Sequence, residues 1–231
     1  MTPQQRRREQ KIRQILDAGE QIVLKSGLDG LTIHALARAL DYTPGALYRY
    51  FPSKQAIIAE LNSRAVQGYH RLFESVAAAS SETQVSSEKA ATLLPLMASA
   101  EAFIRRSGRE PGAFAMVSAT AADPRDLLTD SEAVHIPHLV ALLASLRGAI
   151  DGAVNSGAIQ PGDSDKRAIA LTFGLIGILQ LRKLVRFSSA LSPEPIARGL
   201  ARDQLAGWGA PAYLIEELQP LSNAIVDAVL G

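Results

Sequence analysis

Three consecutive residues, Tyr48, Arg49 and Tyr50, follow a Thr-Pro-Gly turn within the segment LTIHALARALDYTPGALYRYFPSK, which runs from Leu31 to Lys54. An arginine guanidinium matches the paired acceptors that guanine presents in the major groove of DNA. A small residue such as Gly45 lets a helix N-terminus approach DNA closely, and helix N-termini attract phosphate. These residue types favour a DNA-binding surface, whereas tyrosines on a short helix are also typical of half-buried packing.

Two short helices joined by a turn are predicted to position these side chains. The first begins after Thr32, whose hydroxyl suits an N-cap, and its apolar residues follow the i, i+3, i+4, i+7 pattern: Ile33, Leu36, Ala37 and Leu40. The second begins after Thr43, with Pro44 at the first helical position, where its missing N–H carries no penalty. Leu47 and Phe51 are four residues apart and are expected to anchor this helix inward.

The string TPGALYRYFPSK resembles the recognition-helix signature of the tetracycline-repressor (TetR) family. The preceding string ILDAGEQIVLKSGLDGLTIHALARAL is similar to the family's first two helices, with Gly27, Gly30 and Thr32 in a Gly-x-x-Gly-x-Thr segment. The resemblance covers residues 10–65 and is nearly absent afterwards. It implies an all-α fold, with a three-helix, homeodomain-like helix-turn-helix DNA-binding domain over residues 1–64 and an effector-binding and dimerisation domain over residues 65–231.

The resemblance also implies a function, namely a ligand-responsive transcriptional regulator. The expected protein is a repressor that binds a palindromic double-stranded DNA operator as a homodimer and is released by a small-molecule effector. By match to the family motif, six residues are expected to contact the DNA backbone: Thr32, Thr43, Gly45, Tyr48, Tyr50 and Lys54. Arg49 varies in the family, so its base-reading role rests on chemistry alone, with Pro44 and Gly45 adding apolar contacts.

The charge distribution and the composition favour some kinds of partner and site and exclude others. The net charge is +1, but residues 1–64 hold 10 Lys and Arg against 6 Asp and Glu, while residues 65–231 hold 14 against 17. A basic head on a mildly acidic body fits nucleic-acid contact at one end. The absence of cysteine excludes disulfides and thiolate metal sites. The longest apolar run, from Ala168 to Leu179, fits a buried helix better than a membrane span, so a soluble, cytoplasmic protein with no membrane partner is expected.

The N-terminal nine residues are predicted to be disordered. Arg6, Arg7 and Arg8 are consecutive there. They are expected either to form a basic arm that contacts DNA or to be a solvated tail.

The rest of the chain is predicted to be helical, because no alternating strand pattern occurs. The expected helices cover residues 10–26, 53–79, 89–107, 113–122, 131–156, 163–187, 192–207 and 212–230. A polar linker is expected over residues 80–88.

The helix from Asp163 to Phe187 is apolar around most of its circumference, although Gly174 and Gly177 weaken it. Close approach of another helix would offset that loss. By position in the family, this helix and the one from Ala212 to Leu230 are expected to form the homodimer interface. The alternative is a core helix of a monomer.

An effector cavity is implied by the resemblance. Six apolar residues are candidates for its walls: Met97, Phe103, Phe114, Met116, Phe173 and Trp208. Three polar residues are candidates for anchoring the ligand: His135, His138 and Arg147. Met and Phe at helical spacing are also typical of core residues. The His135–His138 pair lacks a third ligand, so no metal and no cofactor are expected.

No catalytic constellation stands out, and the chain is not expected to be an enzyme. The alternative function is a nonspecific or architectural DNA-binding protein. The apolar-rich second domain argues against that alternative.

Overall fold

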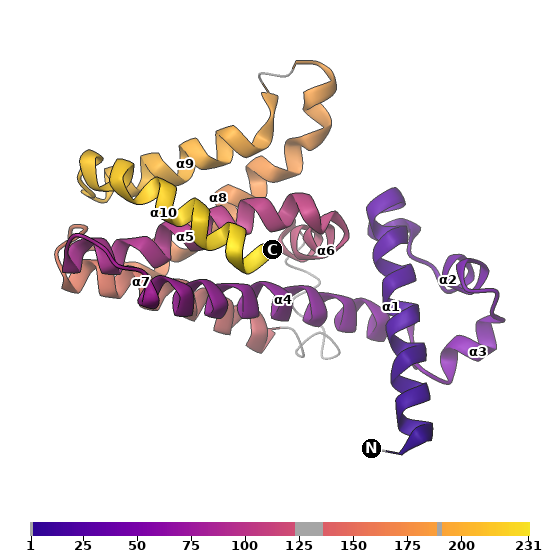
Figure 1. Ribbon diagram of the computed structural model, residues 1–231. Coiled ribbons are helices and arrows are strands. Elements are labelled where there is room, and N and C mark those ends of the chain that lie inside the picture. Colours follow the sequence, from indigo (N-terminus) through magenta and orange to yellow (C-terminus); the bar gives the residue numbers. More distant parts are fainter. Residues whose placement is uncertain (1, 123–135, 189–190) are drawn as a thin grey trace. The chain divides into compact units, whose positions relative to one another are not determined.

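The computed structural model of the 231-residue chain describes residues 2–122, 136–188 and 191–231. Every regular element in these ranges is helical (Figure 1), which confirms the predicted all-α fold. Packing divides the chain into two units. The first comprises Met1–Gln67 with Glu110–His138, and the second comprises Gly68–Arg109 with Leu139–Gly231.

The first unit is built on α1 (Pro3–Gly30), against which α2 (Ile33–Ala39) packs, followed by α3 (Pro44–Tyr48). The first half of α4 (Lys54–Glu82) and α6 (Pro111–Ala122) complete it. Helix α6 packs on α1 so closely that a Cβ on Gly112 would lie 3.3 Å from the Cβ of Glu20. This packing joins segments far apart in sequence, and the predicted division after residue 64 did not anticipate it.

The prediction of a disordered N-terminus is wrong, because α1 begins at Pro3. Thr2 and Gln5 form a capping box: the Thr2 hydroxyl accepts from the Gln5 N–H, and the Gln5 side chain accepts from the Thr2 N–H. Pro3 occupies the first turn, where proline is well tolerated. These three local signals begin the helix seven residues before the predicted start.

Two glycines shape the end of α1, for different reasons. Gly27 has φ +71° and ψ −178°, a conformation essentially restricted to glycine, and it interrupts the helix. A Cβ on Gly30 would lie 2.3 Å from the Cβ of Ser26. After them Leu31 is fully buried, and Thr32 caps α2 by accepting from the Ala35 N–H at 3.0 Å.

The second unit contains the remaining helices. They are the second half of α4, α5 (Glu88–Arg109), α7 (Ile136–Asn155) from Leu139 onward, α8 (Ser164–Leu179), the 3₁₀ helix η2 (Gln180–Arg186), α9 (Pro193–Gly207) and α10 (Ala212–Leu230). Helix α10 packs mainly along α5, while α9 packs on both α8 and α5. The core of this unit therefore gathers around α5, most of whose residues from Leu93 to Ile104 are buried.

The predicted helix from Asp163 to Phe187 is two elements. Its start is confirmed, since Asp163 caps α8 by accepting from the Lys166 N–H at 3.0 Å. The regular helix ends at Leu179 and continues as η2. Arg182 in η2 donates to the carbonyl oxygen and hydroxyl of Ser107 at 2.6 and 2.8 Å. This tertiary contact fixes η2 against the end of α5.

Candidate nucleic-acid interface and effector pocket

The short helix α3 is held by its caps and two anchors. The Thr43 hydroxyl accepts from the Ala46 N–H at 3.3 Å, and Pro44 occupies the first turn. Leu47 is fully buried and Phe51 nearly so. A five-residue helix has no independent stability, so burial of these two side chains holds α3 in place.

The remaining face of α3 is open. Tyr48 is 51% exposed, and Thr43, Gly45 and Arg49 are also exposed. No atom lies within 4 Å of where a Cβ of Gly45 would be, so the start of the helix is unobstructed. The structure therefore brings the predicted DNA-reading side chains together on one accessible surface.

The other predicted DNA-contacting residues surround this surface. Thr32 is exposed at the start of α2, whereas Pro44, Tyr50 and Lys54 are half-buried. Their DNA contacts stay predictions. The turn between α2 and α3 places Asp41 at φ +53°, as expected for a tight helix-turn-helix connection.

One neighbour of α3 was not predicted. The ammonium of Lys11 in α1 lies 5.4 Å from the centre of the Tyr42 ring. A side-chain hydrogen bond to Tyr42, together with the charges of Tyr42 and Tyr50, raises the pKa of Lys11. The contact joins residues 31 positions apart, so helix periodicity within α1 could not indicate it.

Comparison with known families identifies this arrangement. Residues 15–61 match the model described as "Bacterial regulatory proteins, tetR family". This segment is similar to the DNA-binding part of TetR-family regulators. The matched segment runs from the buried part of α1 to the first turns of α4, so it includes both helices of the helix-turn-helix.

Solved structures of TetR-family and related regulators share the fold at low sequence identity. The fatty acid degradation regulator FadR from Bacillus halodurans has a TM-score of 0.65 at 14% identity, covering 87% of this chain and 97% of FadR. SmeT, the repressor of a Stenotrophomonas maltophilia multidrug efflux pump, has a TM-score of 0.64 at 16% identity, covering 88% and 92%. AibR, solved with isovaleryl coenzyme A and operator DNA, has a TM-score of 0.62 at 18% identity, covering 82% and 95%. No curated protein sequence matches this chain.

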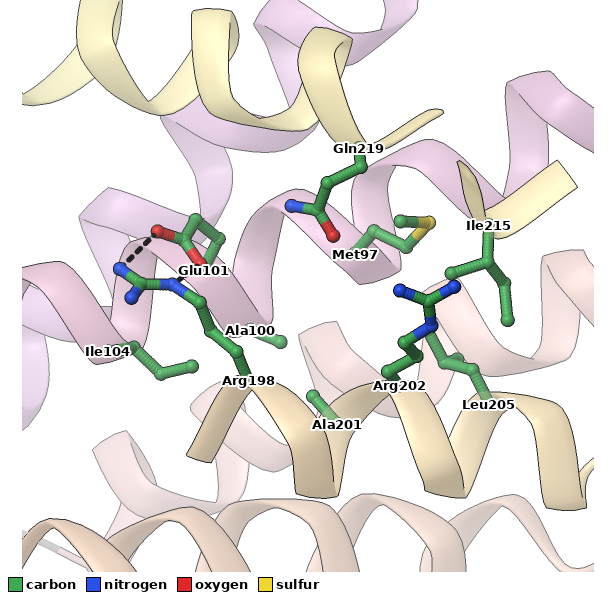
Figure 2. Close-up of a pocket in the computed structure, with 10 residues that line it drawn as sticks. All are labelled: Met97, Ala100, Glu101, Ile104, Arg198, Ala201, Arg202, Leu205, Ile215 and Gln219. Atoms are coloured by element: carbon green, nitrogen blue, oxygen red, sulfur yellow. Dashed lines mark hydrogen bonds and ion pairs between the residues drawn. The ribbon is translucent and has the colours of Figure 1, made fainter. Parts of the chain in front are cut away.

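A small pocket lies in the second unit, between α5, α9 and α10 (Figure 2). Its cavity volume is about 30 Å³, room for about one water molecule. The apolar part of the wall is formed by Met97, Ala100, Ile104, Ala201, Leu205 and Ile215, and the polar part by Glu101, Arg198, Arg202 and Gln219.

Glu101 is the charged centre of that wall. It is buried, and it accepts from Arg105 at 2.6 Å and from two nitrogens of Arg198 at 2.8 and 2.9 Å. Arg105 also pairs with Asp227 and bonds Asn223 at 3.2 Å. Hydrogen bonding to Glu101 raises the pKa of Arg198. Glu101 therefore joins α5 to α9 directly and to α10 through Arg105.

The predicted effector-lining residues lie in different places. Met97 lines the pocket. Phe103 is buried in α5 and packs on Tyr69, with ring centres 4.7 Å apart. Phe114 and Met116 are buried in α6, which belongs to the first unit.

Three further candidates have other neighbours. Phe173 is 39% exposed on α8. The Arg167 guanidinium lies 5.2 Å from the Trp208 ring centre. Arg147 is half exposed and pairs with Asp151 and Asp165 at 4.0 and 3.7 Å. His135 lies outside the described residues, and the side chain of His138 is not described.

Two features are absent from residues 2–122, 136–188 and 191–231. No group of three or more His, Asp or Glu residues there could hold a metal ion. No helix there is both long and apolar enough to cross a membrane.

Proposed function

We propose that this protein is a repressor that binds a palindromic operator as a homodimer and is released by a small-molecule effector. The observation that carries the proposal is the exposed face of α3, with Tyr48 and Arg49 outward and Leu47 buried beneath them. Its match to the TetR-family model supports placing this helix in the major groove. Arg49 then reads a base, while Thr43 and Tyr48 position α3 on the phosphates.

An exposed apolar stripe supports dimerisation. The stripe begins on α8, where Ile169 and Phe173 lie four residues apart on one face. Leu181 and Val185 follow it in the 3₁₀ helix η2, and each of the four side chains is 39% exposed or more. Gly177 lies within the same series, with no atom within 4 Å of where its Cβ would be. A glycine among exposed apolar side chains suits close approach of a second copy, and an isologous contact repeats the stripe on both subunits.

The two glycines of α8 have different surroundings. A Cβ on Gly174 would lie 2.8 Å from the Cδ2 atom of Leu200 in α9, so close packing within the chain accounts for this glycine. Gly177 has no such neighbour within the chain, so we assign it to the proposed interface, where it allows close approach of a second copy. The predicted participation of α10 stays a prediction, because α10 packs on α5 and its large exposed apolar residue is Tyr213.

For the effector, we propose the pocket between α5, α9 and α10. Ligand sites for drug-sized molecules measure about 300–1,000 Å³, about ten to thirty times the volume of this cavity, so binding would move α9 or α10 away from α5. Motion of α9 would break the Glu101–Arg198 pair, and motion of α10 would break the contacts of Arg105 with Asp227 and Asn223. Since α9 also packs on α8, opening the pocket would disturb the helix that carries the proposed dimer stripe.

The chemistry of the pocket favours an effector with an acidic group and a short apolar part. Arg198 and Arg202 lie one helical turn apart on its wall, beside Met97, Leu205 and Ile215 (Figure 2). Arginine binds carboxylate through two parallel hydrogen bonds. Arg198 now pairs with Glu101 and Arg202 with Glu216 at 3.1 Å, so an acidic effector would replace one of these carboxylates. AibR, which shares the fold, was solved with an acyl coenzyme A and operator DNA together, which supports effector and DNA sites on one such chain.

The test is selection of DNA from a random-sequence library by the purified protein at near-physiological salt. A palindrome with two related half-sites is the expected result. Equal affinity for selected and random sequences would instead favour the architectural alternative. Short-chain carboxylic acids are then titrated into the complex, and an Arg198→Ala variant should require more acid for release while binding the operator as before.

A further inference from the structure

The first turns of α1 form a charged surface that the helix-turn-helix does not use. Residues 2–11 are all exposed, and the buried residues of α1 begin at Ile15. Between residues 2 and 16 there are five Lys or Arg and one acidic residue, Glu9. The capping box at Thr2 keeps this segment helical without packing, so its arginines have fixed directions.

Lys11 shows which side of α1 faces the recognition helix. Its ammonium lies 5.4 Å from the centre of the Tyr42 ring, and Tyr42 is the residue before the cap of α3. Arg7 and Arg8 precede Lys11 by four and three residues, so they lie on the same helix face. In Figure 1 the N-terminal end of α1 extends beyond the level of α3.

Arg6 and Arg13 lie on the other side of α1. They are five residues before and two residues after Lys11, and they share a shallow groove with Glu9 and Asp17. Asp17 pairs with Arg64 of α4 at 2.6 Å. These two arginines therefore have the same charge and exposure as Arg7 and Arg8 but face α4 instead of α3.

We infer that the Arg7–Arg8–Lys11 face of α1 is a second DNA-binding surface, which grips the phosphates flanking the half-site read by α3. The inference rests on the proposed DNA-binding function and extends it. A helix rises 1.5 Å per residue, so Arg7 and Arg8 lie about 6 and 4.5 Å along α1 from Lys11. One base pair rises about 3.4 Å. The face spans a length comparable to one or two base pairs, so it can meet one or two phosphates beside the half-site.

The surface suits sequence-independent binding. Arginine pairs with phosphate through its planar fork of donors, and contacts to phosphate position a protein without reading bases. The flanking contacts would thus add affinity and salt sensitivity while leaving the half-site sequence to α3.

The experiment compares two double variants on the operator obtained by selection. Arg7→Ala/Arg8→Ala removes the proposed contacts, and Arg6→Ala/Arg13→Ala removes the same charge from the opposite face. Alanine is the best helix former, so α1 stays helical in both. The Kd is measured by fluorescence anisotropy between 50 and 200 mM salt.

Each phosphate contact contributes about 0.9 to the slope of log affinity against log salt concentration. Loss of two contacts lowers the slope by about 1.8 per bound subunit. Between 50 and 200 mM salt, the variant should therefore lose about 12-fold less affinity per subunit than the wild type loses. The Arg6→Ala/Arg13→Ala control should keep nearly the wild-type slope. Arg7→Lys/Arg8→Lys should restore it, because lysine also neutralises phosphate.

A second measurement places the contacts on DNA. Trimming about five base pairs from each flank should weaken the wild type much more than Arg7→Ala/Arg8→Ala, since that variant retains only Lys11 on this face. The inference is overturned if both double variants reduce the slope equally or if neither does. A wild type that enriches no sequence and binds no duplex overturns the proposed function as well, which distinguishes the two failures.

Discussion

Phe173→Ala should weaken the proposed dimer about a thousandfold. An aromatic side chain buries about 150–250 Å², and Phe173 leaves 39% of its surface exposed, so about 80 Å² per subunit is available for the interface. At about 25 cal/mol per Å² this area stabilises the dimer by about 2 kcal/mol per subunit. A symmetric dimer contains the residue twice, so the loss is about 4 kcal/mol, or roughly 10³ in the dissociation constant.

The assay is the dimer dissociation constant, from sedimentation over nanomolar to micromolar protein concentrations. Leu24→Ala is the matched control, because Leu24 is 42% exposed but belongs to α1 of the first unit, which carries no residue of the stripe. Its dissociation constant should equal that of the wild type. Tyr213→Ala, at a residue 67% exposed on α10, separates the two parts of the predicted interface, since it weakens the dimer only if α10 takes part.

Two results would refute the reasoning about the stripe. One is a Phe173→Ala dimer as tight as the wild type. The other is a wild-type chain that remains monomeric at micromolar concentration, which would make α8 the exposed helix of a monomer.

Three other predictions concern the head and the charged pair of the pocket. Tyr48→Ala should weaken binding to all DNA sequences, while Arg49→Ala should relax preference at one position per half-site by about 1–3 kcal/mol; an equal loss on every sequence in a competition assay would contradict base reading by Arg49. Glu101→Ala should lower the free energy of unfolding in urea by about 2–3 kcal/mol. This is less than the roughly 3–5 kcal/mol for breaking a fully buried ion pair, because Arg105 and Arg198 retain access to water. Wild-type stability would mean that these ion pairs do not stabilise the fold. Gly27→Ala should cost about 1–3 kcal/mol, and an unchanged melting temperature would show that the backbone there relaxes freely.

Local signals made the helix-turn-helix predictable. Thr32, Thr43 and Asp163 each cap a helix through the expected hydroxyl or carboxylate. Leu47 and Phe51 are buried as their spacing predicts. Each of these features depends on residues within four positions of one another, so the local sequence is sufficient to predict it.

Contacts between distant segments were not predictable in the same way. The end of α8 at Leu179 has no local signal, and the contact that fixes η2 joins Arg182 to Ser107. The Lys11–Tyr42 contact likewise depends on how α1 and α2 pack. The capping box at Thr2 is different, because Thr-Pro-x-Gln is a local signal that outweighs the high charge of the segment.

The residues that hold α3 in place differ from those that face outward, and this separation affects how the proposed DNA target can change. Leu47 and Phe51 hold the helix from below, while Gly45 and Arg49 face outward without supporting the fold. Substitutions at the outward positions can therefore accumulate at little cost in stability. Under the proposed function, exchanging one or two of these side chains would change the DNA sequence that α3 reads, and a designer can retarget the protein by the same route.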